Sequence, residues 1–156
     1  FTRYGPSVVE GLKERGKKVF LDLKYHDIPN TVANAVKSAA AIGADMTNVH
    51  ASGGPAMLKA AKAAAADTGL ILIAVTVLTS LDENELAAVG MDCSPAEHVI
   101  RLARLTQDCG IAGVVCSPLE VEAIHDACGR DFVLVVPGIR PAGSSKGDQK
   151  RVMTPA

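Results

Sequence analysis

The sequence predicts an α/β protein of the (β/α)8-barrel class, and three observations support this. Five apolar runs of strand length alternate with helix-like segments, as in a parallel sheet whose strands are joined by helices. Polar residues recur where these strands should end, namely at Lys24, His50, Thr79, Ser117 and Arg140. An open doubly wound sheet also fits the alternation, but no Gly-x-Gly-x-x-Gly follows any strand. A barrel, which collects polar residues at one end, is therefore favoured.

The elements follow from the spacing of apolar residues along the chain. Strands are predicted over residues 19–24, 46–50, 70–78, 112–116 and 132–136. Helices are predicted over residues 6–16, 31–42, 55–67, 82–89, 95–109 and 118–128. In the second helix Val32, Ala35 and Val36 lie on one face, and Asn30 or Thr31 is expected to cap it. The run 70–78 is apolar on both faces, as parallel strands covered by helices tend to be.

Composition narrows the class of protein. The chain has 156 residues with 16 basic and 17 acidic ones. It therefore lacks the excess of positive charge that is typical of nucleic-acid-binding proteins. No apolar run reaches membrane-spanning length. The 4 cysteines form no C-x-x-C pair and no zinc-ligand spacing, which is typical of reduced thiols in a cytosolic enzyme. We expect one domain over residues 1–156 that is cytoplasmic and has no metal, nucleic-acid partner or membrane partner.

Two charged residues occur on the first predicted strand. Because side chains alternate along a strand, Asp22 and Lys24 share a face with Phe20. Ionised groups on a core strand are costly unless they pair with each other or face a site. Asp27 follows three residues later, just before Pro29 ends the strand ladder. The Asp-x-Lys-x-x-Asp array is thus either a structural ion pair beside a loop aspartate or, as we favour, a site.

The array also indicates a kind of chemistry. A lysine between two carboxylates is held in its charged form. Such a lysine is a poor Schiff-base nucleophile but a well-placed proton donor. Lys24, flanked by Asp22 and Asp27, is therefore predicted to protonate a carbanion or an enolate.

A second group of polar residues lies near the end of the chain. It consists of Arg140, Ser144, Ser145, Lys146 and Gln149. The glycine- and serine-rich segment 142–148 is either a surface loop or one that closes over a phosphate and becomes ordered with a nucleotide.

Single polar residues allow weaker predictions. Thr79 either contacts a ligand or forms a turn. His50 is predicted to be a hydrogen-bonded core residue and His26 a neighbour of the site, whereas His98 and His125 are predicted on helix surfaces.

The segment DLKYHDIPNT at residues 22–31 resembles the signature of the orotidine 5′-phosphate decarboxylase family, especially its bacterial branch. The resemblance continues through VHA at 49–51, VTVLTS at 75–80, PGIRP at 137–141 and GDQKRVMTP at 147–155. Related sugar-phosphate decarboxylases and aldolases share the Asp-x-Lys-x-x-Asp array alone. The IPNT continuation and the GDQ segment make the resemblance specific.

The resemblance implies a (β/α)8-barrel homodimer that converts orotidine 5′-phosphate to UMP and CO2, the last step of de novo UMP biosynthesis, without metal or organic cofactor. It implies that Lys24 protonates C6 and that Asp22 lies beside the departing carboxylate. It also implies that Asp27, Ile28 and Thr31 contact the nucleotide bound in the neighbouring subunit. The remaining residues implied to contact the nucleotide are Thr79, Pro137, Arg140 and Gln149.

Five strands do not close an eight-stranded barrel, and Thr154-Pro155 is a helix-start signal near the last residue. We therefore expect an internal portion of a barrel that lacks the first two strands and the last. Two alternatives stay open. One is a sugar-phosphate decarboxylase or aldolase of the same superfamily, and the other is a non-catalytic fragment.

Overall fold

The structure, a computed structural model, describes residues 1–139. Its five strands form one sheet in the order β1-β2-β3-β4-β5, and every strand runs parallel to its neighbour. The strands are β1 (Phe20–Tyr25), β2 (Met46–His50), β3 (Ile71–Val75), β4 (Gly113–Val115) and β5 (Val133–Val135). Within residues 1–139 each strand pairs with the next one along the chain, as in a barrel, and the strand order does not reverse as it does in a doubly wound sheet. The prediction of five parallel strands is confirmed.

The helices also fall where the apolar spacing predicted them. They are α1 (Ser7–Glu14), α2 (Pro29–Ala41), α3 (Gly54–Ala65), α4 (Glu83–Ala88), α5 (Pro95–Asp108) and α6 (Val121–Cys128), with two short 3-10 turns, η1 (Ala51–Gly53) and η2 (Pro118–Glu120). The predicted cap of α2 is wrong. The helix begins at Pro29 with Ile28 as N-cap and no side-chain cap, because proline suits the first helical position.

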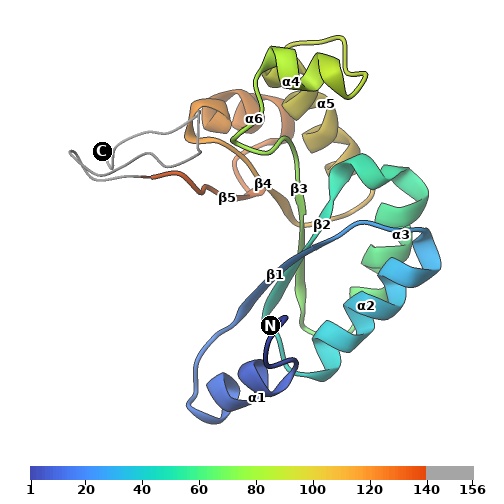
Figure 1. Ribbon diagram of the computed structural model, residues 1–156, viewed down its shortest axis with the longest axis vertical. Helices are drawn as coiled ribbons and strands as arrows, with labels where there is room; N and C mark the ends of the chain where they lie inside the picture. The colour runs from blue at the N-terminus through green and yellow to red at the C-terminus, as the bar shows by residue number, and fades with distance from the viewer. Residues whose placement is uncertain (140–156) are drawn as a thin grey trace.

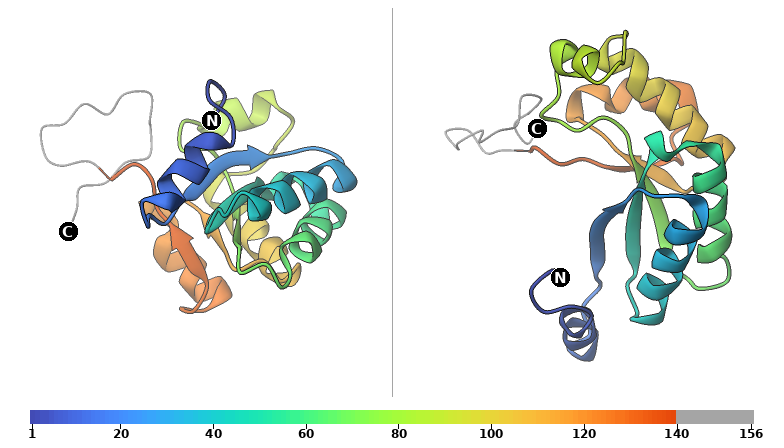
Figure 2. Two further views of the ribbon diagram at one scale, coloured as in Figure 1. Left: turned by 90° about the horizontal axis from the view of Figure 1, so that it is seen from below. Right: turned by 45° about the vertical axis from the view of Figure 1, so that its right-hand side comes forward.

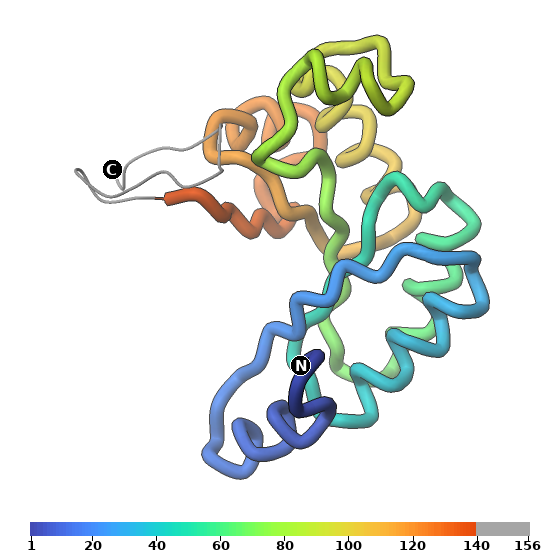
Figure 3. Tube along the Cα trace, in the orientation of Figure 1, coloured from blue at the N-terminus to red at the C-terminus, as the bar shows by residue number. Residues whose placement is uncertain are grey.

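Helices α2, α3, α5 and α6 all lie on the same side of the twisted sheet (Figures 1 and 2). The path of the chain repeats a strand and a returning helix along the sheet (Figure 3). In the described residues no helix is both long enough and apolar enough to cross a bilayer. The four cysteines are free thiols.

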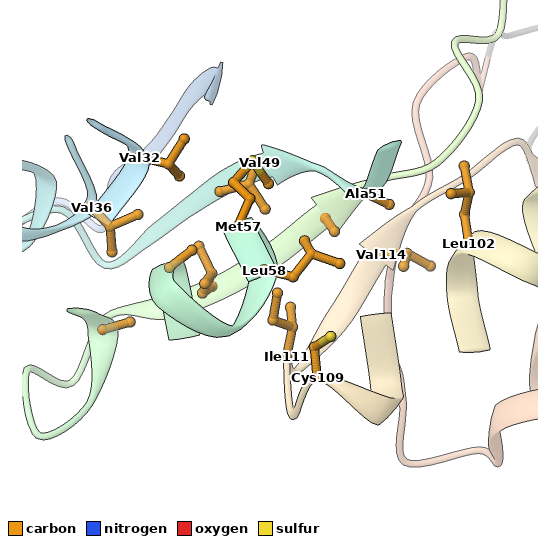
Figure 4. Close-up of a cluster of buried hydrophobic side chains, with 14 of the residues drawn as sticks. Val32, Val36, Val49, Ala51, Met57, Leu58, Leu102, Cys109, Ile111 and Val114 are labelled. Carbon is orange, nitrogen blue, oxygen red and sulfur yellow. The ribbon is translucent and has the colours of Figure 1, made fainter. Parts of the chain in front are cut away.

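The hydrophobic core lies between the sheet and these helices (Figure 4). Alternate residues of the strands point into it, and the inner faces of the helices meet them. Its strongly buried members include Leu21, Val32, Val36, Val49, Met57, Leu58, Leu72, Ala74, Val114 and Ile124. Burying one such large side chain contributes about 1.5–3 kcal/mol to stability. This packing fixes which strand residues face away from the helices.

The other face of the sheet carries the remaining strand residues, among them Phe20, Asp22, Asn48 and Val75. Phe20 and Ile71 are 39% and 43% exposed although both are large and apolar. In a closed barrel such residues fill the interior in layers. The open face of this sheet therefore has the composition of a barrel interior, and the predicted orientation of Asp22 and Lys24 toward it is confirmed.

Gly113 holds β4 and β5 at close range. It pairs with Val133, and a Cβ on Gly113 would clash with the backbone carbonyl of Val133.

We expect Gly113→Ala to lower the free energy of unfolding by about 1–3 kcal/mol, because the strands must separate. Urea denaturation measures this. The control is Gly11→Ala in α1, where an added Cβ meets nothing within 4 Å. This variant should gain about 0.5–1 kcal/mol. Equal stability of the two variants would contradict the packing described.

Candidate active site

A cavity of about 290 Å³ opens on the face of the sheet away from the helices, toward the carboxyl ends of the strands. Its lining consists of Phe20, Asp22, Lys24, Asn48, Val75, Val77, Leu78, Thr79, Val115, Cys116, Val135 and Pro137. Polar side chains come mainly from β1 and β2, and apolar ones form the rest of the wall. Apolar walls with a few convergent polar groups are typical of ligand sites, and the carboxyl end of the strands is where barrel enzymes bind substrates.

The polar part of the cavity is organised around the carboxylate of Asp22. The Lys24 ammonium donates a hydrogen bond to Asp22 Oδ1 at 2.6 Å. Asn48 Nδ2 donates to the same oxygen at 2.6 Å. Burial acts to raise the pKa of Asp22, but the hydrogen bonds from Lys24 and Asn48 and the charges of Lys24 and His50 outweigh it and lower this pKa below its ordinary value. Asp22 is therefore ionised at neutral pH beside a cationic lysine.

The backbone is irregular at this ion pair. Leu21 pairs with Thr47 and Tyr25 with Val49, so β1 has two more residues than β2 over this stretch. Lys24 lies in the interruption with a φ of 50°, a left-handed conformation that L side chains seldom adopt. Such a conformation costs about 1–2 kcal/mol and persists where the surroundings enforce it.

The cavity brings together four of the residues predicted for the site: Asp22, Lys24, Thr79 and Pro137. Asp27, Ile28 and Thr31 do not line it. Asp27 Oδ1 accepts a hydrogen bond from the Ile28 backbone N–H at 2.6 Å, and Ile28 is 68% exposed. In the described residues Lys24 has an ion pair with one carboxylate, that of Asp22.

The second predicted group lies outside the described residues. This concerns Arg140, Ser144, Ser145, Lys146 and Gln149, together with the predicted ordering of the 142–148 loop. Within residues 1–139 no group of three or more histidine, cysteine or acidic side chains is placed to hold a metal ion. Ser117 is fully buried and has a structural role, since its hydroxyl accepts from the Leu119 N–H at the start of η2.

Sequence reasoning missed Asn48. This side chain is 1% exposed, yet it contacts both members of the ion pair. The signal was available, because alternation along the second strand places Asn48 on the same face as Met46 and His50. A buried amide on a face opposite the helices needs a polar partner there.

Two of the four histidines, His98 and His50, depart from the predictions. His98 is 7% exposed rather than on the surface, because it belongs to the buried face of α5 and lines a cavity there. His50 is half-buried rather than in the core, and its ring centre lies 5.4 Å from that of His26. Together with Ser52, Thr76 and several apolar residues, these three histidines line a second cavity of about 210 Å³. His98 Nδ1 has no hydrogen-bond partner in the described structure.

This burial predicts a pH dependence of stability. Burial, and next the charge of Arg101, lower the pKa of His98. The unfolded chain therefore binds a proton on this residue more readily, and the contribution of neutral His98 to stability is full above about pH 6.5 and falls as the pH drops below it. We expect His98→Leu to reduce the loss of stability between about pH 7.5 and 5.5, measured by urea denaturation. A loss of stability over this pH range that is as large in His98→Leu as in the wild type would contradict this role of His98.

The chain is similar in sequence to known proteins. A model of the family described as "Orotidine 5'-phosphate decarboxylase / HUMPS family" matches residues 1–156. Proteins named orotidine 5'-phosphate decarboxylase from Enterobacter sp. (strain 638) and Salmonella gallinarum are 56% and 58% identical to it over 158 aligned positions. Each alignment covers 99% of this chain and 64% of the relative. The chain thus spans less than two thirds of the length of these relatives.

Two solved structures resemble the described fold. The crystal structure of orotidine 5'-phosphate decarboxylase from Lactobacillus acidophilus has a TM-score of 0.79 and 44% sequence identity, covering 88% of this chain and 65% of that one. An uncharacterized conserved protein from Geobacillus kaustophilus has a TM-score of 0.83 and 44% identity, covering 87% of this chain and 66% of that one. The parallel sheet therefore corresponds to part of a (β/α)8 barrel. By its sequence over residues 1–156 the chain belongs to the orotidine 5'-phosphate decarboxylase / HUMPS family.

Proposed function

We propose that the protein that carries this chain decarboxylates orotidine 5′-phosphate to UMP and CO2, with Lys24 as the proton donor to C6. The observation that carries this proposal is the Asp22–Lys24 ion pair at the polar side of a cavity with apolar walls. The names of relatives that are 56–58% identical support the choice of substrate.

The reaction breaks the bond between C6 and the carboxylate carbon. The electron pair of this bond stays on C6, CO2 leaves, and C6 takes a proton from Lys24 Nζ. The ammonium therefore stabilises the negative charge as it develops and then neutralises it. A fixed cation acts most strongly where water is excluded, and the apolar wall from Val75 to Pro137 favours such exclusion.

Asp22 has two roles in this proposal. Its carboxylate holds the Lys24 ammonium at 2.6 Å, which orients the proton donor. It also lies where the carboxylate of the substrate would approach, so that charge repulsion is relieved as CO2 leaves. We rank this second effect below the first, because the contribution of ground-state destabilisation is contested.

The remaining contacts follow from the family resemblance. Thr79, Pro137 and Gln149 contact the nucleotide, and Arg140 lies at the entrance of the loop that binds its phosphate. Binding of a phosphate remote from C6 provides energy that is used at the reacting carbon. We further propose a single-domain, cytoplasmic homodimer in which Asp27, Ile28 and Thr31 enter the neighbouring site. The exposure of Ile28, at 68%, supports a contact that another subunit completes.

The test is an assay of the protein that carries this chain with two substrates. Orotidine 5′-phosphate should disappear and UMP should appear in equal amounts, measured by chromatography and mass spectrometry. A pentose or hexulose phosphate without a nucleobase is the comparison substrate and should be turned over far more slowly. Preferential turnover of the sugar phosphate would assign the other activity of the superfamily. Binding of both without turnover would contradict an enzymatic role.

A further inference from the structure

Asn48 joins the two members of the ion pair from the neighbouring strand. The Lys24 backbone N–H donates to Asn48 Oδ1 at 2.8 Å, and Asn48 Nδ2 donates to Asp22 Oδ1 at 2.6 Å. The side chain is 1% exposed and lies in the middle of β2. It thus contacts the backbone of one site residue and the carboxylate of the other.

The partners fix the orientation of this amide. A backbone N–H is only a donor, so the Asn48 oxygen must face Lys24. An ionised carboxylate is only an acceptor, so the Asn48 nitrogen must face Asp22. A reversed amide would lose both hydrogen bonds in a buried place, which is costly. Asn48 therefore favours the ionised form of Asp22 in one orientation of its carboxylate.

The same amide supports the irregular backbone of β1. Between the pairs Leu21–Thr47 and Tyr25–Val49 the ladder is interrupted, and there the Lys24 N–H bonds to a side chain of β2. Lys24 keeps its φ of 50° at this point. Because a left-handed non-glycine residue needs surroundings that enforce it, the hydrogen bond from Lys24 to Asn48 is the device that holds the strained residue.

We propose that Asn48 is a positioning residue for the proton transfer, and this rests on the proposed role of Lys24. It acts through two neighbours: it sets the rotation of the Asp22 carboxylate and the backbone of Lys24, and together these place Lys24 Nζ in the cavity. Both polar atoms of the buried Asn48 amide form hydrogen bonds to Lys24 or Asp22, so this side chain does more than fill space in the sheet.

The test compares three variants of the protein that carries this chain. Asn48→Leu keeps the size of the side chain and removes both hydrogen bonds, while Asn48→Ser is a smaller, polar second variant in case the first fails to fold. Thr47→Val is the matched control. Thr47 is the adjacent buried residue of β2, and it donates to the Leu21 carbonyl at 2.8 Å from the helix side of the strand. It therefore reports on strand pairing without touching the pair.

We expect Asn48→Leu to lower kcat for orotidine 5′-phosphate about 100-fold with KM changed less than about threefold, because the donor is misplaced while the nucleotide still binds. Asn48→Ser should likewise lower kcat and leave KM little changed. Thr47→Val should keep kcat within about threefold. Equal losses of kcat in Thr47→Val and Asn48→Leu would reduce Asn48 to a structural residue and overturn the proposal.

A second readout does not depend on the substrate. The carboxyl carbon of Asp22, followed by ¹³C NMR during a pH titration, should show a higher pKa in Asn48→Leu than in the wild type, and an unchanged one in Thr47→Val. An unshifted titration in Asn48→Leu and Asn48→Ser would overturn the proposal. Failure of the wild type to turn over orotidine 5′-phosphate would instead contradict the proposed function. The titration of Asp22 would then still test whether Asn48 holds the Asp22 carboxylate.

Discussion

Replacing Lys24 with alanine should lower kcat for orotidine 5′-phosphate at least about 1,000-fold while leaving nucleotide binding nearly unchanged. The variant loses both the proton donor and the cation that stabilises charge on C6, and both act mainly in the transition state. Steady-state kinetics gives kcat, and calorimetric titration with UMP gives the affinity. The melting temperature should change little, because the Lys24–Asp22 pair is 39% and 47% exposed and such pairs contribute little to stability.

Lys13→Ala is the matched control for this variant. Lys13 also forms an ion pair, with Asp45 at 2.7 Å, and both side chains are 34% exposed. That pair links α1 to the start of β2, and neither residue lines the candidate active site. We expect full turnover in Lys13→Ala. Substantial turnover by a folded Lys24→Ala variant would remove Lys24 from its proposed role.

Mixing two inactive variants should restore activity if Asp27 acts across a subunit interface. In the described chain Asp27 is exposed, bonds to its own neighbour Ile28 and does not pair with Lys24. Lys24→Ala and Asp27→Asn are unfolded together and refolded as a mixture. Each mixed dimer then holds one site with an intact Lys24 and an intact Asp27. With random association we expect about a quarter of wild-type activity.

The structure offers a negative control for this experiment. Asp22 and Lys24 are bonded within one chain, so a mixture of Lys24→Ala and Asp22→Asn contains no whole site in any dimer. It should stay inactive. Mass spectrometry establishes that mixed dimers formed in both mixtures. An inactive Lys24→Ala/Asp27→Asn mixture that contains mixed dimers would place Asp27 in its own subunit's site or outside the mechanism.

Much of the fold could be predicted because the buried faces of helices and strands place apolar residues at regular intervals in the sequence. Strand β2 (Met46–His50) was predicted at its observed bounds, and α5 within one residue of its end. Strand β3 is shorter than predicted, since the apolar run continues beyond Val75 into residues that pack outside the strand ladder. Apolar periodicity thus reports which residues are buried, and hydrogen bonding decides where the strand ends.

Of the residues predicted for the site, Asp22, Lys24, Thr79 and Pro137 line the cavity, but the sequence predicted neither Asn48 nor the contacts among these residues. Alternation placed Asp22 and Lys24 on one face, and both line the cavity. The interruption of β1 and the left-handed Lys24 depend on pairing between strands, which no local pattern encodes. Alternation indicates the face on which Asn48 lies, but its hydrogen bonds to Lys24 and Asp22 depend on the same pairing. His98 was misplaced for a related reason, because it lines a cavity together with residues of other segments, which helical spacing within α5 does not reveal.

The most direct test of the central claim is a crystal structure of the protein that carries this chain with UMP bound. We expect the pyrimidine to lie against the apolar wall of the cavity, with C6 directed at Lys24 Nζ at about 3 Å. Asp22 should still accept from Lys24 and Asn48. UMP bound with C6 turned away from Lys24, or bound outside the cavity of Asp22, Lys24 and Thr79, would contradict it.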